Sequence, residues 1–252
     1  MALFADTIAP LGATDLDLEE VGQGPSSKHL LGTDDIGRDV WARVAFGAQT
    51  SLIVGVGAVS ISLLIGISVG LASGYFGRWV DTILMRITDG FMSVPPLILI
   101  IVFIAIFGPS LTTVILVIAL TTWPTSARVV RGQVLTLREQ EFLVAAKVIG
   151  VKDSKAIFVH IFPNLLGPLS VVGTFGIASA ILIEAGLSFL GLGVRPPTSS
   201  WGQMVNLAQQ PDILLDKIWI WVPSAFLIVI TVLAINFIGD GLRKAVDPKS
   251  VR

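Results

Sequence analysis

The feature that most constrains this chain is a long stretch without charge. No Asp, Glu, Lys or Arg occurs from Thr50 to Phe76, and SLIVGVGAVSISLLIGISVGL (Ser51 to Leu71) is almost entirely apolar. A helix of about 20 apolar residues is what crosses a bilayer core of about 30 Å. Charged residues make up 14% of the chain, against about 25% in soluble domains. The sequence therefore excludes an ordinary water-soluble globule and predicts an all-α membrane protein.

Four further apolar runs predict four more spans. The run Val94 to Phe107 has only 14 residues. We expect its helix to include upstream turns from about Ile83 and to be kinked at Pro95 and Pro96, because proline interrupts the backbone hydrogen bonds. The other spans are expected at about Leu111 to Val130 with a bend near Pro124, Leu165 to Leu190, and Ile218 to Ile238. The prediction is about five transmembrane helices.

The distribution of Lys and Arg predicts the orientation. Basic residues gather in cytoplasmic loops, and alternate loops of the five-span topology can be pooled and counted. One pool holds 12 of the 17 Lys and Arg residues, and the other holds 5 in a greater length of chain. The first pool comprises residues 75–92, 127–164 and the tail after Gly239. The sequence thus predicts a cytoplasmic C-terminus and a multi-pass protein of a bacterial or archaeal plasma membrane.

The N-terminal segment is acidic and would lie outside the cell. Its first 49 residues contain eight Asp and Glu residues, without the basic start and apolar core of a signal peptide. Two interpretations follow. Either a sixth, N-terminal span is missing and MALFADTIAP is its outer end, or the segment crosses the membrane unaided. An in-frame stop codon upstream with no apolar stretch would contradict the missing-span hypothesis.

Small residues recur at every fourth position of the first span. They form one helical stripe, which lets a second helix approach closely in lipid. The stripe predicts either a fixed contact with a partner helix or packing within this chain, and the second is the more frequent case. Its members are Ala58, Ser62, Gly66, Gly70 and Gly74.

The longest cytoplasmic loop, Ala127 to Pro163, has a helical pattern. Arg138-Glu139-Gln140-Glu141 leads into FLVAAKVIG, in which Phe142, Ala145, Ala146 and Ile149 share one helical face. Gly150 suits a C-terminal cap. Asp153 or Ser154 could then cap a second short helix, Lys155 to Phe162, before Pro163. The pattern predicts a helix-turn-helix, either lying on the membrane or docking a cytoplasmic protein.

Three stretches of the sequence resemble a known family. The spacing within the loop is similar to the ATPase-binding loop of ABC importer permeases. Two other stretches, LGTDDIGRDVWARVAFGAQTSL (Leu31 to Leu52) and EAGLSFLGLGVRPPTSSWGQM (Glu184 to Met204), resemble the peptide/nickel importer permeases in particular. The resemblance runs from about Leu31 to Asp247. One departure is that Val144 stands where the family often has an acid, and Glu141 lies about one turn earlier. The coupling residues implied by the resemblance are Glu141, Ala145, Ala146, Gly150, Ile161 and Pro163.

The resemblance implies the fold, the domains and the partners. It implies a type I ABC importer permease fold, with an extracytoplasmic segment 1–46, a permease domain 47–243 containing the coupling loop 127–163, and a cytoplasmic tail 244–252. The implied partners are a homologous permease, two cytoplasmic ABC ATPases and an extracytoplasmic substrate-binding protein. Family members usually carry a sixth span, and their substrates include peptides and nickel or its complexes.

The chain offers few groups for chemistry of its own. No Gly is followed by Lys, so a phosphate-binding P-loop is absent from the sequence, and we expect ATP and magnesium to be bound by the partner ATPases. The net charge of −1 gives no basic stripe for nucleic acid. Cysteine is absent, and His29 and His160 fall on opposite sides of the membrane, so no metal site is predicted.

Glu184 is an ionisable group inside an apolar span, and two roles are open for it. Such residues face protein or water, not lipid. Glu184 either lines or gates the translocation path, or it is a buried acid hydrogen-bonded to a neighbouring helix. If Glu184 lines the path, Glu184→Gln should slow uptake without loss of assembly.

Two classes of function are therefore compared. The first is the membrane subunit of an ATP-driven importer. The second is a self-contained secondary transporter or intramembrane enzyme, which would need several convergent ionisable groups within the spans. The predicted spans Ser51 to Leu71, Leu165 to Leu190 and Ile218 to Ile238 offer only Glu184 and scattered hydroxyls. The sequence favours the importer subunit.

Overall fold

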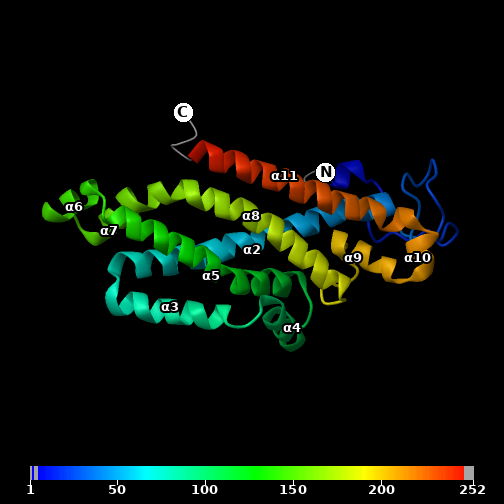
Figure 1. Ribbon diagram of the computed structural model, residues 1–252. Coiled ribbons are helices and arrows are strands. Elements are labelled where there is room, and N and C mark those ends of the chain that lie inside the picture. Colours follow the sequence, from blue (N-terminus) through cyan, green and yellow to red (C-terminus); the bar gives the residue numbers. More distant parts are fainter. Residues whose placement is uncertain (1, 3–4, 247–252) are drawn as a thin grey trace. The chain divides into compact units, whose positions relative to one another are not determined.

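The computed structural model describes residue 2 and residues 5–246, and its regular structure there is helical (Figure 1). Two isolated β-bridges, Leu16–Arg38 and Thr33–Asp39, join parts of the N-terminal loop. The longer helices are α2 (Val40–Phe76), α3 (Arg78–Met92), α4 (Pro96–Phe107), α5 (Leu111–Arg138), α8 (Phe162–Phe189) and α11 (Val222–Val246). The shorter ones are α1 (Ala5–Ile8), α6 (Glu141–Val148), α7 (Asp153–Lys155), α9 (Trp201–Asn206) and α10 (Pro211–Leu215), with the π-helical turn η2 (Ala156–Ile161) and the 3₁₀ turns η3 (Leu207–Gln209) and η4 (Ile218–Ile220).

Among the described residues, four helical stretches are long and apolar enough to cross a membrane: Val40–Phe76, Leu111–Arg138, Asp153–Phe189 and Ile218–Ala245. Helices α3 and α4 meet at 82° and supply a fifth crossing if they form one broken span. The kink expected at Pro95 and Pro96 is confirmed, since α4 begins at Pro96 after this break. Proline is tolerated there because the first residues of a helix have no intrahelical acceptor for their N–H groups.

The helices extend beyond the apolar runs that predicted them. Helix α2 begins at Val40, well before Ser51, and continues to Phe76. Its start is set by Asp39, whose Oδ1 accepts the Ala42 backbone N–H at 2.7 Å, an N-terminal cap. Helix α5 is likewise continuous through Pro124 to Arg138. An apolar run in the sequence marks only the lipid-covered part of a helix, and the whole helix is longer than that run.

The chain forms two compact units. Unit 1 comprises Met1–Gly57, Phe103–Leu116 and Ile177–Ala234, and unit 2 comprises Ala58–Val102, Val117–Gly176 and Ile235–Arg252. In unit 1, Val40 and Val44 of α2 pack with Met204, Ile213 and Ile220. The unit 2 core is made by α2, α5, α6, η2 and α8, and its fully buried members include Val134, Leu143, Ile161 and Leu165.

In unit 2, α2 and α5 run in the same direction. At three glycines of α2 the backbone lies so close to α5 that an added Cβ would come within 3 Å of α5 atoms. The contact pairs are Gly66 with Ser126, Gly70 with Val130, and Gly74 with Val134. Along both helices the contacting residues follow in the same order, so α2 and α5 are parallel. The chain between them must therefore run back from the end of α2 to the start of α5. This favours α3 and α4 as one broken span.

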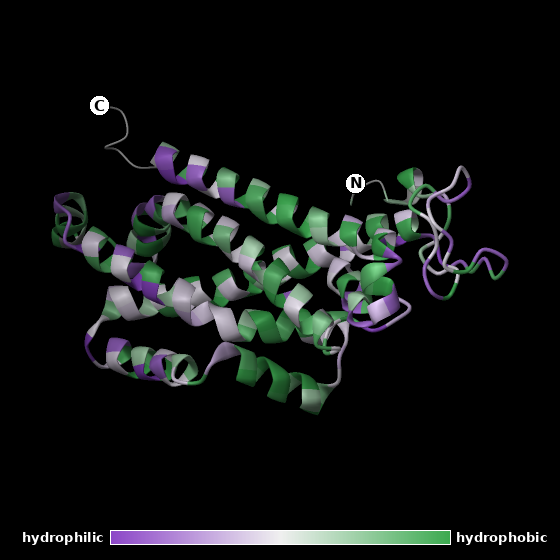
Figure 2. Ribbon diagram, turned by 45° about the vertical axis from the view of Figure 1, so that its right-hand side comes forward, coloured by the Kyte–Doolittle hydropathy of each residue, from purple (hydrophilic) through white to green (hydrophobic). Residues whose placement is uncertain are grey.

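Hydropathy differs between the helices and the loops (Figure 2). Helix α4, PLILIIVFIAIF, is apolar at every position, and Leu64, Ile106 and Phe237 are more than 60% exposed. Hydrophilic residues gather in the N-terminal loop and in the last turns of α11, which carry Arg243 and Lys244. Large exposed apolar side chains on long helices are what a lipid environment requires.

Candidate functional site

The segment Glu141–Pro163 is held on the end of the α2–α5 pair in unit 2. Leu143, Ala156 and Ile161 are buried in a cluster with Tyr75 of α2 and Val134 of α5. The Tyr75 hydroxyl donates a hydrogen bond to Asp153 Oδ1 at 2.6 Å. Burial of several apolar side chains and a side-chain hydrogen bond make this segment a built extension of the helices, not a loose loop.

The six coupling residues divide into two groups. Ala146 is 7% exposed and Ile161 is fully buried, so these two hold the segment in place. The other four are exposed: Glu141, Ala145, Gly150 and Pro163. Phe142 and Ile149 lie on the exposed side with Ala145, whereas Ala146, which the sequence pattern assigned to the same face, points into the core with Leu143.

The segment confirms one predicted turn and corrects another. Gly150 has φ +79°, and the Val151 N–H bonds back to the Ala146 carbonyl at 3.0 Å, as a glycine C-terminal cap does. The predicted cap at Asp153 or Ser154 is wrong, because α7 begins at Asp153 with Lys152 before it.

The separate short helix Lys155 to Phe162 is also absent. Residues Asp153–Phe189 instead form one continuous helical stretch. It passes Pro163 directly after the π-helical turn η2. A π-type turn shifts the backbone hydrogen bonds to i→i+5, and it relieves the clash and the lost donor that proline introduces.

The small-residue stripe of α2 lies against α5 of the same chain in unit 2. Ala58 is fully buried, and Ser62 accepts a hydrogen bond from Thr122 Oγ1 at 3.1 Å. A Cβ on Gly70 would lie 2.6 Å from the Ala127 carbonyl oxygen and from Val130 Cβ. This is the packing geometry that small residues allow in lipid.

Ion pairs fix α3 alongside α5 in unit 2, and sequence reasoning missed them (Figure 1). Arg131 forms a bidentate pair with Asp81, with both N···O distances at 2.6 Å. Arg128 Nη2 lies 2.6 Å from Asp89 Oδ1. The signal was present, since Asp81 and Asp89 are the two acids of segment 75–92, but pairing partners depend on which helices pack together.

Glu184 is fully buried in unit 1 and hydrogen-bonded. Its Oε1 accepts from Ser188 Oγ at 2.7 Å, and its Oε2 accepts from Ser51 Oγ of α2 at 3.3 Å. The Ser51 oxygen also accepts the Trp201 backbone N–H at 3.3 Å. This geometry corresponds to the second of the two roles considered, a buried acid bonded to a neighbouring helix.

A buried ion pair in unit 1 was not predicted. Arg43 Nη1 lies 2.5 Å from Asp34 Oδ2, and the two side chains are 1% and 0% exposed. Arg38 Nε binds the same oxygen at 2.7 Å, and Arg43 Nη2 donates to Gln203 Oε1 at 3.3 Å. Burial alone would raise the pKa of Asp34, but the Arg38 N–H and the charges of Arg43 and Arg38 outweigh it and hold that pKa below its usual value. The residues fall in two stretches that carried the family resemblance.

These features define a multi-pass helical membrane protein with a docked segment at one end of a helix pair. Residues 62–252 match the family described as binding-protein-dependent transport system inner membrane component. The chain belongs to this family, and it is the membrane permease subunit of an ABC importer.

Curated relatives and solved structures agree with this assignment. A protein of Brucella suis biovar 1 (strain 1330) that carries the provisional name of a peptide permease is 45% identical over 241 residues, 96% of this chain and 80% of its own length. The dipeptide transport system permease protein DppC of Alkalihalophilus pseudofirmus is 42% identical over 249 residues, 99% of this chain and 81% of its own length. A chain of the MetNI methionine ABC transporter in inward-facing conformations shares the fold, with a TM-score of 0.63 and 20% identity over 80% of this chain and 94% of that one.

Proposed function

We propose that this subunit forms, with a homologous permease, the translocation path for peptides, and that two separate ATPases drive it through the segment Glu141–Pro163. The observation that carries the proposal is this segment's combination of a buried inner face and an exposed apolar outer face. Peptides are proposed as the substrate because the most similar curated relatives are named as peptide and dipeptide permeases.

The outer face of the segment is suited to a protein partner. Val148 and Ile149 are 81% and 79% exposed, and Phe142 and Val144 are about half exposed. A compact apolar group with Glu141 at one end resembles the core and rim of a protein interface. The alternative, an interfacial membrane helix, would need a broad apolar face along its length, and α6 has only eight residues.

The buried inner face of the segment Glu141–Pro163 would transmit movement of the ATPases to the spanning helices. Leu143 and Ile161 are fully buried against α2 and α5 residues of unit 2. Closure of the ATPases on ATP would press on the region from Glu141 to His160 and move the ends of the helices packed beneath it, as alternating access requires. The chain itself supplies no P-loop, so ATP and its magnesium belong to the partners.

A single substitution tests the docking proposal. Val148→Glu places a charge on the exposed face without touching the core, and it should abolish co-purification of the ATPases and peptide-stimulated ATP hydrolysis. Leu18→Glu is the matched control, because Leu18 is 76% exposed and lies in the N-terminal loop. Normal ATPase binding by Val148→Glu, or equal loss in both variants, would contradict the proposal.

The orientation can be tested on the same positions. The sequence contains no cysteine, so Val148→Cys and Leu18→Cys each introduce one thiol. With the C-terminus and the coupling segment cytoplasmic, an impermeant maleimide should label Leu18→Cys in intact cells. Val148→Cys should be labelled only after the membrane is opened. The opposite result would overturn the orientation.

Energy coupling separates the proposal from a self-contained transporter. We expect that the purified chain in vesicles neither carries peptide nor hydrolyses ATP. Uptake should appear only when the second permease, the ATPases and an extracytoplasmic substrate-binding protein are added. Uptake driven by an ion gradient with this chain alone would favour the secondary transporter.

A further inference from the structure

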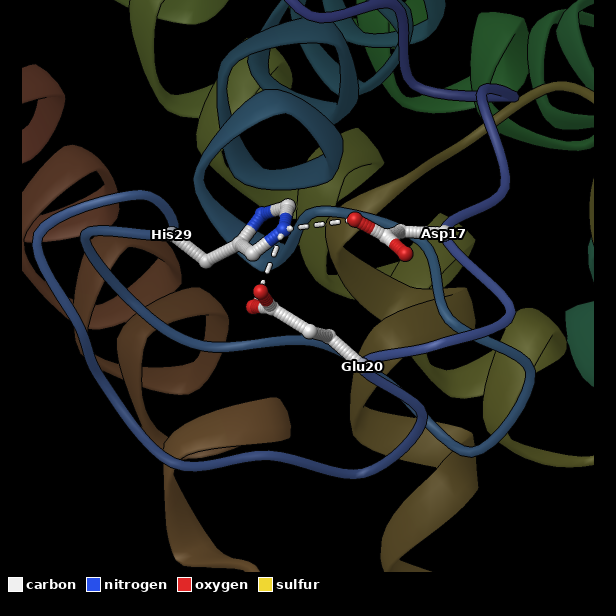
Figure 3. Close-up of side chains that lie close together, drawn as sticks. All are labelled: Asp17, Glu20 and His29. Carbon is white, nitrogen blue, oxygen red and sulfur yellow. Dashed lines mark ion pairs between the residues drawn. The ribbon is translucent and has the colours of Figure 1, made fainter.

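Two acidic side chains and a histidine converge in the N-terminal loop of unit 1 (Figure 3). Asp17, Glu20 and His29 each offer one possible ligand atom, and these atoms lie within 4.8 Å of one another. His29 Nε2 is 3.6 Å from Asp17 Oδ2 and 3.6 Å from Glu20 Oε2. All three residues precede α2, outside the helices that could cross a membrane.

The environment of His29 prepares one ring nitrogen for a ligand. Its side chain is 4% exposed, and Nδ1 lies 2.8 Å from Asp39 Oδ2, to which it donates when Nδ1 carries the proton. Nε2 is buried and has no hydrogen-bond partner among the residues that the structure describes. A carboxylate on one ring nitrogen fixes the tautomer and turns the lone pair of the other toward its surroundings, as in carboxylate–histidine–metal arrangements.

The two carboxylates already attract a cation. Lys28 Nζ lies 2.5 Å from Asp17 Oδ2 and 3.2 Å from Glu20 Oε1. The Lys28 side chain is 58% exposed and can move into solvent when another cation takes its place. A cavity of about 360 Å³, lined by Asp17, Lys28, His29 and Asp39 among others, gives access to the cluster.

We propose that Asp17, Glu20 and His29 bind a divalent transition-metal ion of the Zn²⁺ class, with Asp39 orienting the histidine. Ligand atoms about 2.0–2.2 Å from a tetrahedral Zn²⁺ lie about 3.3–3.6 Å apart, and both His29 distances are 3.6 Å. An imidazole donor favours Zn²⁺ over Ca²⁺ or Mg²⁺, which take oxygen ligands. The sequence alone does not point to this group, because the chain's other histidine, His160, lies far away in the sequence and the two acids have no distinctive spacing to His29.

The ion would tie the loop to the start of α2. Asp39 holds His29 through Oδ2 and caps α2 through Oδ1, which accepts the Ala42 N–H. A metal on His29 would therefore connect the residues around Asp17 and Glu20 to the first turn of a spanning helix. The site would make the order of this loop depend on the free metal concentration outside the spans.

Zinc titration of the full-length chain without a histidine tag tests the proposal. Competition with a chromophoric chelator should give one Zn²⁺ per chain, and Co²⁺ should give the visible absorption of a tetrahedral N/O site. His29→Gln, Asp17→Asn and Glu20→Gln should each weaken Zn²⁺ binding at least tenfold. Asp39→Asn, which keeps a cap acceptor, should weaken it about tenfold to 100-fold.

Matched variants keep the test decisive if His29→Gln does not fold. Lys28→Gln removes the competing ammonium group and should tighten Zn²⁺ binding severalfold. Glu19→Gln changes charge beside the cluster, and His160→Gln removes the other of the chain's two histidines. Both should bind Zn²⁺ within about twofold of the unchanged protein. Absence of Zn²⁺ binding, or an equal effect of the ligand and control variants, would overturn the proposal.

Discussion

In unit 1, distant segments meet through hydrogen bonds and ion pairs, whereas in unit 2 the α2–α5 contact depends on the absence of side chains. Glu184 accepts a hydrogen bond from Ser51 across two helices, and Arg43, which pairs with Asp34 at 2.5 Å, also donates to Gln203, 160 positions away. At Gly70 of unit 2, by contrast, α5 backbone and Val130 Cβ occupy the space where a Cβ would be. The difference teaches that the contacts of Glu184 and Asp34 in unit 1 are sensitive to charge and donor pattern, and that the α2–α5 contact in unit 2 is sensitive to volume.

The largest effect is expected from Asp34→Asn. The amide has the shape of the carboxylate, but its NH₂ group would face Arg43 and Arg38, leaving Arg43 buried without a carboxylate. Removing one partner of a buried ion pair costs about 3–5 kcal/mol, measured as the free energy of unfolding in detergent. The control Asp212→Asn concerns a 58% exposed side chain 3.8 Å from Lys217 and should change stability by about 0–1 kcal/mol. Equal effects would show that charge does not distinguish unit 1.

Gly70→Ala should have the next largest effect. The new methyl group would lie 2.6 Å from a backbone oxygen that cannot rotate away. Overpacking of this kind costs about 1–3 kcal/mol, and thermal unfolding should register it. Gly132→Ala on α5 is the control, since nothing lies within 4 Å of its added Cβ. There the better helix propensity of alanine should stabilise the chain by up to about 1 kcal/mol. A harmless Gly70→Ala would break the comparison.

A smaller change is expected from Glu184→Gln. The hydroxyls of Ser51 and Ser188 can rotate to accept from the new amide, so we expect a loss of about 1 kcal/mol or less. Glu184→Leu leaves both hydroxyls without this partner and should cost about 1–3 kcal/mol. Assembly of the purified complex and its rate of uptake should both be measured. Slow uptake by a stable Glu184→Gln variant would instead support a role in the translocation path.

The smallest effect is expected on mild acidification. The pKa of Asp34 in the folded chain lies below the ordinary value of 3.8, so its contribution to stability is complete above that value and is lost as the pH falls below it. The free energy of unfolding should therefore change little, as far as Asp34 is concerned, between about pH 7 and 5, and fall near pH 4 and below. The difference between the unchanged protein and Asp34→Asn should shrink in the same acid range. A constant difference down to pH 3 would show that another group controls acid unfolding.

Sequence reasoning predicted the apolar helices that can span a membrane and the turn that needs a glycine. The apolar runs predicted the four long spanning helices and the bent pair α3–α4, which supplies a fifth crossing if it is one broken span, and Gly150 ended α6 at the expected place. The same reasoning placed the first span from Ser51, because Arg43 and Gln49 interrupt the apolar sequence before it, whereas Asp39 caps the helix at Val40. It also expected a stop before Pro163, where the π-helical turn lets the helix continue.

Functional residues could be predicted where their pattern is local in the sequence, and not where it depends on contacts between distant residues. The coupling segment was visible because its helical spacing and its glycine are local in sequence. The contact of Arg43 with Gln203 joins residues 160 positions apart, and the ion pairs of α3 with α5 join residues 39 and 50 positions apart. Which of several acids faces a given arginine is decided by helix packing, and hydropathy does not contain that information.

The parallel packing of α2 and α5 also has a consequence for synthesis of the chain. Ser62 and Thr122 are separated by 60 residues, and a ribosome adds about 5–20 residues each second. The time between synthesis of the glycine face of α2 and synthesis of its contact residues in α5 is therefore on the order of 3–12 s. During that interval α3 and α4 must be inserted without occupying the face. The order of synthesis thus leaves the glycine face of α2 without its α5 partner until α5 has been made.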